Sequence, residues 1–412
     1  MYKWKTLVRS LALKRQRRFI YVRSLALKRQ LSGSTLQSDH YVQVPDRSLV
    51  EVNGEDGVKF LQGLITNHMP SIQSGGDGFY SAFLNPVGRV LYDTFVYPKN
   101  VGTTFPHQIY LIECDSRIVS DLIKHMKKYV LRSKVSINDV SSQYNVWNMW
   151  GGNIDNLWLR YQVPNLSATK LPIGSLVLKE RIAEIGCKDK RCPYMGLRFV
   201  LPFDTTPSVP SSFKQLPSNE YKIRRILYGI PEGIEDLPPG SSLPLQCNFD
   251  YMRGIDWHKG CYIGQELTFR TYYVGVTRKR IIPVQLVHQD ESLPTTLQVD
   301  RTVDFPLPPS STGIYASIET LSKKSRPIGA IGSSCNNIAL ALLNLDKVQD
   351  ENLIVASGRG EFPFSKYPYA DSSSNNHGTN NDSSRDNTTG RTRIIVAIGT
   401  INIWFTSWGI YE

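Results

Sequence analysis

The chain has 412 residues, of which 41% are hydrophobic and 20% are charged, and it carries a formal net charge of +12. This composition excludes a largely disordered chain and leaves room for two or three domains. An excess of basic over acidic residues favours a nucleic-acid partner, but ten lysines and arginines lie in residues 1–38, which hold no acidic residue. The remainder is close to neutral, so we expect no nucleic-acid partner.

The basic segment, residues 1–38, contains the sequence VRSLALKRQ twice, at 8–16 and at 22–30. A spacing of about four helical turns places the apolar residues of both copies on one side of a helix. An arginine-rich amphipathic segment without acidic residues is typical of an organelle transit peptide. We therefore predict a mitochondrial transit peptide and a location in the mitochondrial matrix. The alternatives are the chloroplast and a disordered basic or RNA-binding arm.

Local patterns of apolar residues and turn formers predict helices and strands that alternate without strict βαβ order, which favours the α+β class. In chain order, these elements are a helix from Asp56 to about Asn67, a hairpin over 78–97 around the turn NPVGR, a strand HQIYLIEC, a helix over 116–129, a strand SKVSIND, and a helix over 219–233 that stops at Gly229.

The C-terminal part, residues 281–412, changes to short strands such as RKRIIPVQL and IALALLNL, which predict an all-β module. Residues 365–393 are rich in Ser, Asn, Asp and Thr, so we expect a disordered insertion. The last 18 uncharged residues, 394–411, contain polar residues and glycines that disfavour a tail anchor. We expect them to supply strands that close the β-module, without stable membrane insertion. Residues 39–280 then form a bipartite α+β region.

Several catalytic signatures are missing from the sequence, among them the phosphate-binding G-x-x-x-x-G-K, the dinucleotide-binding G-x-G-x-x-G, G-x-S-x-G and H-E-x-x-H. The six cysteines also lack the spacing of common zinc or redox sites. The segment KGCYIGQE, residues 259–266, therefore holds the strongest candidate group, a cysteine between two glycines.

Two interpretations of Cys261 remain open on local chemistry. A helix starting near Gly264, with Glu266 in its first turn, would place its amide groups close to the thiol, and the Lys259 ammonium would add positive charge. Both would stabilise a thiolate. His258 is a weaker candidate partner for a nucleophilic cysteine. The alternative is a buried structural thiol in a tight turn.

The longer segment LPLQCNFDYMRGIDWHKGCYIGQELTFRT, followed by GVTRKRIIPVQL, resembles the signature of the YgfZ/GcvT-like folate-binding family. It is most similar to the mitochondrial iron-sulfur cluster assembly factor branch, whose hallmark is K-G-C-[FY]-x-G-Q-E, and residues 259–266 match it at every position. The resemblance covers roughly residues 42–345. Further agreement lies in VNGEDGVKFLQGLITNH, NPVGRVLYD, KYVLRSKVSI and GIPEG.

This resemblance implies a cloverleaf of two α+β lobes around a central opening, followed by a C-terminal β-barrel. It implies a role in late assembly of 4Fe-4S clusters, with A-type scaffold proteins, a 2Fe-2S glutaredoxin and 4Fe-4S client enzymes as partners. Members of the branch are not settled as enzymes. A tetrahydrofolate or related pterin is the implied cofactor, and its candidate binding residues are Asp93, Arg89, Gly264, Gln265 and Glu266.

The same resemblance makes Cys261, assisted by Lys259, the candidate catalytic group, with the thiolate in transient contact with iron or a cluster intermediate. A single cysteine cannot hold a cluster that usually needs four ligands, so the others must come from partners, glutathione or a second subunit. One alternative function is a folate-dependent aminomethyl transferase. Tyr92 and Asp93 stand where the transferase relative has two successive aspartates, so one carboxylate is missing and we expect no transfer. The other alternative is a non-catalytic scaffold.

Overall fold

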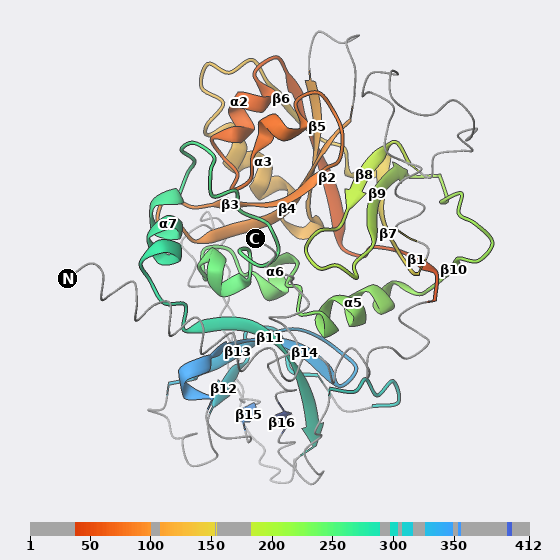
Figure 1. The fold of residues 1–412 in the computed structure, drawn as a ribbon, viewed down its shortest axis with the longest axis vertical. Coiled ribbons are helices and arrows are strands. Elements are labelled where there is room, and N and C mark those ends of the chain that lie inside the picture. Colours follow the sequence, from red (N-terminus) through yellow and green to blue (C-terminus); the bar gives the residue numbers. More distant parts are fainter. Residues whose placement is uncertain are drawn as a thin grey trace, which may run out of the picture.

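The protein folds into two lobes, each built on a five-stranded sheet, and a closed six-stranded barrel (Figure 1). This arrangement confirms the predicted α+β fold with a C-terminal β-barrel. Residues 1–37 and the predicted insertion 365–393 lie outside the described residues. The computed structural model describes residues 38–99, 108–152, 154, 183–288, 297–303, 307–315, 326–348, 353–355 and 394–397.

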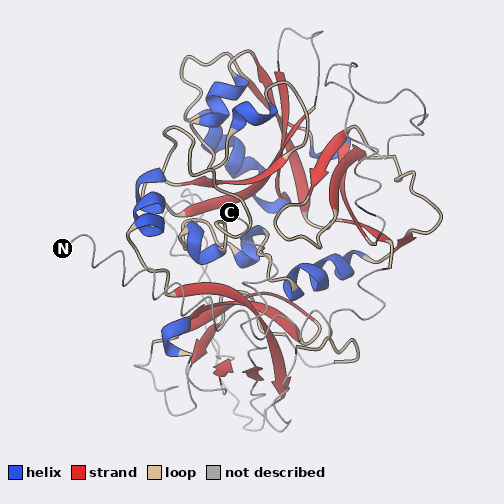
Figure 2. Ribbon diagram, in the orientation of Figure 1, coloured by secondary structure: helices blue, strands red, loops and turns tan. Residues whose placement is uncertain are grey.

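The first lobe is a sheet in the order β3-β4-β5-β2-β6, covered on one side by α2 and α3 (Figure 2). Leu61 of α2 and Leu122 of α3 point into the same apolar core as Val52 of the sheet, which explains the helical spacing of these residues. The elements are β2 (Arg47–Gly54), α2 (Gly57–Gln62), η1 (Met69–Ile72), β3 (Phe79–Leu84), β4 (Val90–Pro98), β5 (Gln108–Asp115), η2 (Ser116–Ile118), α3 (Val119–Lys127) and β6 (Ser136–Asp139).

The second lobe is a sheet in the order β10-β1-β7-β9-β8. Its inner face shares one apolar core with the first sheet, where Val146 and Val200 lie in the same cluster as Leu49 and Phe95. The elements are β1 (His40–Gln43), η3 (Ser141–Gln143), β7 (Tyr144–Trp150), β8 (Ile185–Lys188), β9 (Leu197–Pro202) and β10 (Lys214–Gln215), followed by the helical segment α5 (Ser218–Leu227), α6 (Gly233–Asp236) and η4 (Pro244–Cys247).

The barrel closes in the order β11-β14-β13-β12-β15-β16. The late strand β16 pairs with both β11 and β15, which confirms for residues 394–397 the prediction that the terminal segment closes the β-module. Within the part of the chain that the structure describes, no helix is long and apolar enough to cross a membrane. The elements are β11 (Lys279–His288), β12 (Gly313–Tyr315), β13 (Gly329–Cys335), β14 (Ile338–Asn344), η6 (Leu345–Lys347), β15 (Leu353–Val355) and β16 (Ile394–Ala397).

Most predicted elements are present, and the largest difference is the end of α2. The hairpin of β3 and β4, the strand β5 and the helix α5 lie where the sequence predicts them. The helix α2, however, ends at Gln62 instead of Asn67. Ile65 leaves the helix to form a β-bridge with Phe83, so a contact with the sheet replaces the last turn that local spacing suggested.

A buried ion network links the two sheets. Glu113 of β5 and Arg198 of β9 are both 0% exposed, and their side chains form two hydrogen bonds of 2.9 and 2.6 Å. Arg47 of β2 donates from Nε to the same carboxylate at 2.6 Å. Because an unpaired charge in such a place is very unfavourable, each sheet depends on the other to neutralise its buried charges.

The network continues through Glu232, just before α6. Its Oε2 accepts hydrogen bonds from Arg191 at 2.6 Å and from the Tyr221 hydroxyl at 2.7 Å. Burial alone would raise the pKa of Glu232, but Arg198, Arg191 and Arg47 together hold it well below its usual value. We call the set of Arg47, Glu113, Asp189, Arg191, Arg198, Tyr221 and Glu232 the buried ion network.

Replacing Glu113 by Gln keeps the side-chain shape but removes the charge that two arginines face. We expect the free energy of unfolding to fall by about 3 to 5 kcal/mol, because the arginines stay buried without compensation. Urea unfolding followed by tryptophan fluorescence measures this change. The control is Glu55→Gln, which breaks an exposed pair with Lys134 and should change the free energy by less than about 1 kcal/mol. Equal effects of the two variants would contradict the importance of the network.

Candidate functional site

The candidate cysteine precedes α7 (Gln265–Tyr273), which begins where the sequence predicts a helix. Gly264 takes the left-handed conformation at φ +79° before the first turn, and Glu266 lies in that turn. Glu266 is directed to solvent and pairs with Arg270 at 2.6 Å, one helical turn later. Cys261 therefore sits in the loop that enters α7.

The loop from Asp256 to Ile263 lies against the chain that leaves α2, residues 62–67. The Asp256 N–H donates to the Thr66 carbonyl at 3.1 Å, and the Ile263 N–H donates to the Gly63 carbonyl at 3.1 Å. These two bonds hold the loop at both ends. Cys261 lies between them, so the first lobe fixes the position of its backbone.

Lys259 strengthens this attachment. Its buried ammonium donates to the carbonyl oxygens of Gln62, Ile65 and Asn67 at 2.8, 2.7 and 2.8 Å. Burial lowers the pKa of Lys259 to about 7, while the three carbonyls favour the charged form that donates all three protons. Lys259 therefore holds the loop that bears Cys261 in place, and its ammonium protons are already used by carbonyl oxygens.

Cys261 is the exposed cysteine of the six in the chain. Four others are buried and Cys335 is half-buried. Burial raises the pKa of Cys192 and of Cys247 to about 12, which keeps these two thiols neutral. The exposure of Cys261 contradicts the alternative in which it is a buried structural thiol.

The β3–β4 turn, which contains Arg89, packs against the start of α7. A Cβ atom built on Gly264 would lie 2.5 Å from the Asn85 carbonyl oxygen, and one built on Gly88 would lie 2.9 Å from Leu267. Only glycine allows both approaches. The Arg89 guanidinium donates to the Ser241 carbonyl at 2.5 Å. Arg89, Gly264, Gln265 and Glu266 are therefore on segments that lie side by side.

Asp93 lies in different surroundings from Arg89. It is 3% exposed, accepts a hydrogen bond from the Gly233 N–H at 3.0 Å, and lies 3.1 Å from Arg47 through Oδ2. Burial raises the pKa of Asp93, and Arg47 opposes this shift. Four buried polar atoms here have no hydrogen-bond partner within the described part of the chain: Arg47 Nη1 and Nη2, Asp93 Oδ2 and the Tyr80 hydroxyl.

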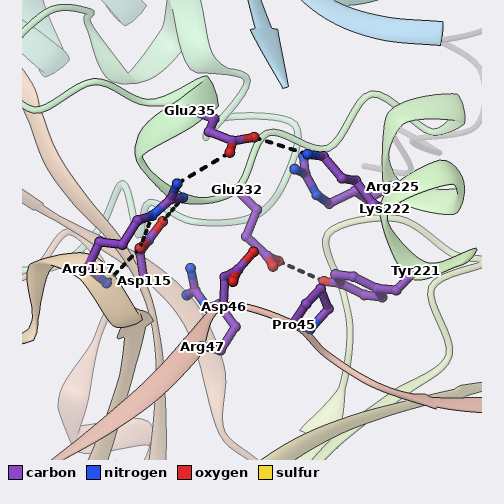
Figure 3. A pocket seen from close by; sticks show the side chains of 11 residues that line it. Pro45, Asp46, Arg47, Asp115, Arg117, Tyr221, Lys222, Arg225, Glu232 and Glu235 are labelled. Carbon is purple, nitrogen blue, oxygen red and sulfur yellow. Dashed lines mark hydrogen bonds and ion pairs between the residues drawn. The ribbon is translucent and has the colours of Figure 1, made fainter. Parts of the chain in front are cut away.

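Arg47 and Gly233 also line a small, mostly charged pocket (Figure 3). Arg117, Tyr221 and Glu232 form part of its wall. Arg47, Arg117 and Glu232 are not among the site residues that the sequence predicts. The available signal was the presence of charged residues directly beside apolar strand residues, as in PDRSLV and LIECDSR.

Tyr92 and Asp93 point to opposite sides of the first sheet, as successive strand residues must. Tyr92 contacts the His125 ring of α3 edge-on, with 6.2 Å between the ring centres. Asp93 faces Arg47 on the other side. A side chain at position 92 therefore does not contact the groups that surround Asp93.

No group of three His, Cys, Asp or Glu side chains in the described ranges is arranged to hold a metal ion. Cys261 can offer one sulfur ligand to iron, and a stable cluster usually needs four. An iron ion or cluster bound at Cys261 would therefore need further ligands that the described residues do not supply.

Comparison with known proteins gives a family for this chain. Residues 278–363 match the model for the CAF17 C-terminal beta-barrel domain. The crystal structure of the glycine cleavage system aminomethyltransferase T from Bartonella henselae has the same fold, with a TM-score of 0.52, 11% identity, and coverage of 89% of this chain and 86% of that one.

Curated relatives are much closer in sequence. A protein of Neosartorya fischeri named iron-sulfur cluster assembly factor IBA57 homolog, mitochondrial, is 38% identical over 78% of this chain and 72% of its own length. The protein of the same name from Neurospora crassa is 33% identical over 88% of this chain and 80% of its own. These names confirm the predicted mitochondrial location. The chain belongs to the family of mitochondrial IBA57 iron-sulfur cluster assembly factors.

Proposed function

We propose that this protein assists the late assembly of 4Fe-4S clusters by presenting the Cys261 thiolate to iron or to a cluster intermediate. The single observation that carries the proposal is the placement of Cys261. It is exposed, while the loop that bears it is held to the first lobe by Lys259 and by hydrogen bonds at both ends. A fixed, accessible thiolate is the form of cysteine that binds metal.

The iron or cluster is the cargo, and the remaining ligands come from partner molecules. Candidate partners are A-type scaffold proteins, a 2Fe-2S glutaredoxin and 4Fe-4S client enzymes, and the names of the relatives support the role in iron-sulfur cluster assembly. The described residues offer no second cysteine exposed beside Cys261. A protein with a single available ligand suits transient transfer better than storage.

We also propose a tetrahydrofolate or related pterin as a ligand near Arg47 and Asp93. The Arg47 Nη2 group and the Tyr80 hydroxyl, which have no hydrogen-bond partner among the described residues, offer donors and an acceptor beside the ion pair of Arg47 and Asp93. The edge of a pterin carries the same mixture of donors and acceptors. Arg89 lies at the turn near α7 and is the weaker of the two predicted anchors. When bound, the pterin supplies one-carbon or redox chemistry, and the residues here would only bind and orient it.

Aminomethyl transfer is not part of this proposal. Asp93 is the available carboxylate, but it is neutralised by Arg47 and bound to Gly233. Tyr92 faces α3 and cannot assist a proton transfer beside Asp93. A scaffold without chemistry remains the alternative, and it predicts that Cys261 is dispensable.

Iodoacetamide should modify Cys261 before any of the other five thiols near neutral pH. Alkylation needs an accessible thiolate, and the other cysteines are buried or half-buried. Mass spectrometry of the native protein after brief labelling identifies the modified residue. The unfolded protein is the control, in which all six thiols should react. Preferential labelling of another cysteine in the native protein would contradict the proposed exposure.

Cys261→Ser should abolish maturation of 4Fe-4S enzymes in cells while changing the free energy of unfolding by about 0.5 kcal/mol or less, because the side chain is exposed. The matched control is Cys335→Ser, which should support maturation normally. The activity of 4Fe-4S enzymes is measured in cells that depend on each variant. Full activity with Cys261→Ser would favour the scaffold alternative.

Lys259→Met should behave differently from Cys261→Ser. Three carbonyl oxygens, in one buried and two part-buried hydrogen bonds, lose their donor, so we expect a loss of about 1 to 3 kcal/mol in unfolding free energy together with partial loss of maturation. Chemical unfolding and the same cellular assay give the two values. A variant as stable as the wild type would show that the ammonium does not hold the loop.

Asp93→Asn should weaken binding of tetrahydrofolate by about tenfold, because a charge-assisted hydrogen bond becomes a neutral one. Arg89→Ala should have a smaller effect. Anaerobic calorimetry measures both affinities. An unchanged affinity for Asp93→Asn, or a larger loss for Arg89→Ala, would place the ligand elsewhere.

A further inference from the structure

The turn that follows α3 presents a leucine to solvent. Leu131 is 88% exposed, the largest fraction among the exposed large apolar side chains of the described residues. The Ser133 N–H donates to the Val130 carbonyl at 2.7 Å, so residues 130–133 form a tight turn with Leu131 and Arg132 in its middle. We call residues 130–133 the α3 turn. Its tip therefore carries an aliphatic side chain that remains in solvent.

The backbone of the α3 turn is unfavourable for leucine. Leu131 has a φ of +45°, in the left-handed region that glycine and asparagine adopt at little cost. A leucine in this conformation lowers stability, and its exposed side chain recovers none of it by packing into a core. A residue held in an unfavourable conformation at the surface indicates a role other than folding.

The rest of the first lobe holds the α3 turn in place. Tyr129 and Val130 pack against the same apolar core as the inner faces of α2 and α3. Just after the turn, the Lys134 N–H donates to the Asp56 carboxylate at 2.8 Å. Leu131 is therefore displayed by a turn that is supported on both sides.

Basic side chains flank the α3 turn. Between positions 119 and 138, five exposed side chains are basic and one, Asp121, is acidic. The apolar residues of α3 face the core, which leaves its lysines on the outer side of the helix. The exposed basic residues of this segment are Lys124, Lys127, Lys128, Arg132 and Lys134.

The neighbouring helix α2, which covers the same side of the sheet, only partly offsets this charge (Figure 2). It adds the exposed Lys59, and two acidic residues precede it. Of these, Glu55 pairs with Lys134 at 2.5 Å, and Asp56 accepts the Lys134 N–H. We call Leu131, Lys59 and the five basic residues above the basic surface. Its six cations outnumber the three acidic residues beside it.

A bilayer with anionic headgroups fits the basic surface better than a protein or a nucleic acid does. A stable protein interface buries roughly 800 Å² on each partner around large anchors, whereas the apolar side chain exposed here is one leucine. Single-stranded nucleic acid stacks on exposed aromatic rings, and positions 119–138 expose none. Anionic lipids attract clustered lysines, and the boundary between headgroups and acyl chains accepts a single aliphatic side chain.

We propose that the basic surface binds reversibly to anionic phospholipid membranes, with Leu131 inserted among the headgroups and the basic side chains in contact with lipid phosphates. One leucine is a weak anchor, so binding needs the apolar and the charged contacts together. The contact is peripheral. It would place the protein at a membrane surface, and it depends neither on the Cys261 thiol nor on a pterin.

A fluorescent label at position 131 tests insertion directly. Leu131→Cys is made in a Cys261→Ser background and is labelled briefly with the environment-sensitive dye NBD. Vesicles of phosphatidylcholine with about 30% phosphatidylglycerol should raise its emission at least about twofold, because the dye leaves water. Vesicles of phosphatidylcholine alone should not. The same label at Phe203→Cys, a site 57% exposed after β9, should respond to neither kind of vesicle.

The contribution of charge has its own variants, compared by sedimentation of the full chain with the anionic vesicles. Lys124→Glu combined with Lys127→Glu should weaken binding at least about tenfold. The matched control is Lys214→Glu combined with Lys347→Glu, which makes the same change of charge at exposed sites elsewhere and should weaken binding less than about threefold. The basic segment 1–38 is present in every variant, so its contribution cancels in the comparison.

Leu131→Gly separates a role in membrane binding from a role in folding. Glycine adopts a φ of +45° freely, so the melting temperature should not fall. Binding to the anionic vesicles should nevertheless weaken roughly fivefold, because the inserted side chain is lost. A lower melting temperature for Leu131→Gly would mean that the leucine serves the fold, and it would overturn the argument.

Three other outcomes overturn the proposal: a label at position 131 that does not respond to anionic vesicles, an equal response to neutral vesicles, or equal weakening by the two charge-reversed pairs. A response of the label to polyuridylate but not to vesicles would identify a nucleic-acid site instead. Circular dichroism of each variant confirms that it is folded.

Discussion

The bond between Glu113 and Arg198 is the interaction on which the rest of the structure depends. It joins the first sheet to the second across the buried interior, and Arg47, Arg191 and Glu232 extend it. A buried pair gives little net stability compared with an apolar core, but removing one member is very unfavourable. The two lobes therefore pack in the arrangement in which the charges of the buried ion network meet their partners.

The barrel is attached through the same kind of contact. Arg225 of α5 pairs with Asp236 at 2.5 Å and donates to the Ser333 hydroxyl of β13 at 2.9 Å. Asp236 also accepts a hydrogen bond from the Ser333 N–H at 2.6 Å. Charged side chains on the helical segment of α5 and α6 thus bind the barrel as well as the lobes, and the pocket beside Arg47 forms between this segment and the first lobe.

This rigid frame explains how an exposed cysteine keeps a defined position. The first sheet holds α2, the chain leaving α2 accepts the three hydrogen bonds of Lys259, and Lys259 holds the loop that carries Cys261. The thiol stays exposed on its outer side. Under the proposed function, one ligand on a fixed support is the arrangement expected of a protein that shares its cargo with a partner.

The sequence by itself determined the elements and the reactive segment, because both depend on local patterns. Alternation and turn residues predicted the β3–β4 hairpin, helical spacing predicted α5, and KGCYIGQE located Cys261 and the start of α7. Contacts between distant residues were decided only by the tertiary structure. Lys259 meets carbonyls almost 200 positions earlier, and Glu113 and Arg198 are 85 positions apart with no periodic signal that pairs them. The local spacing of apolar residues also predicted a longer α2 than the structure has, because the bridge from Ile65 to Phe83 exists only once the sheet has formed.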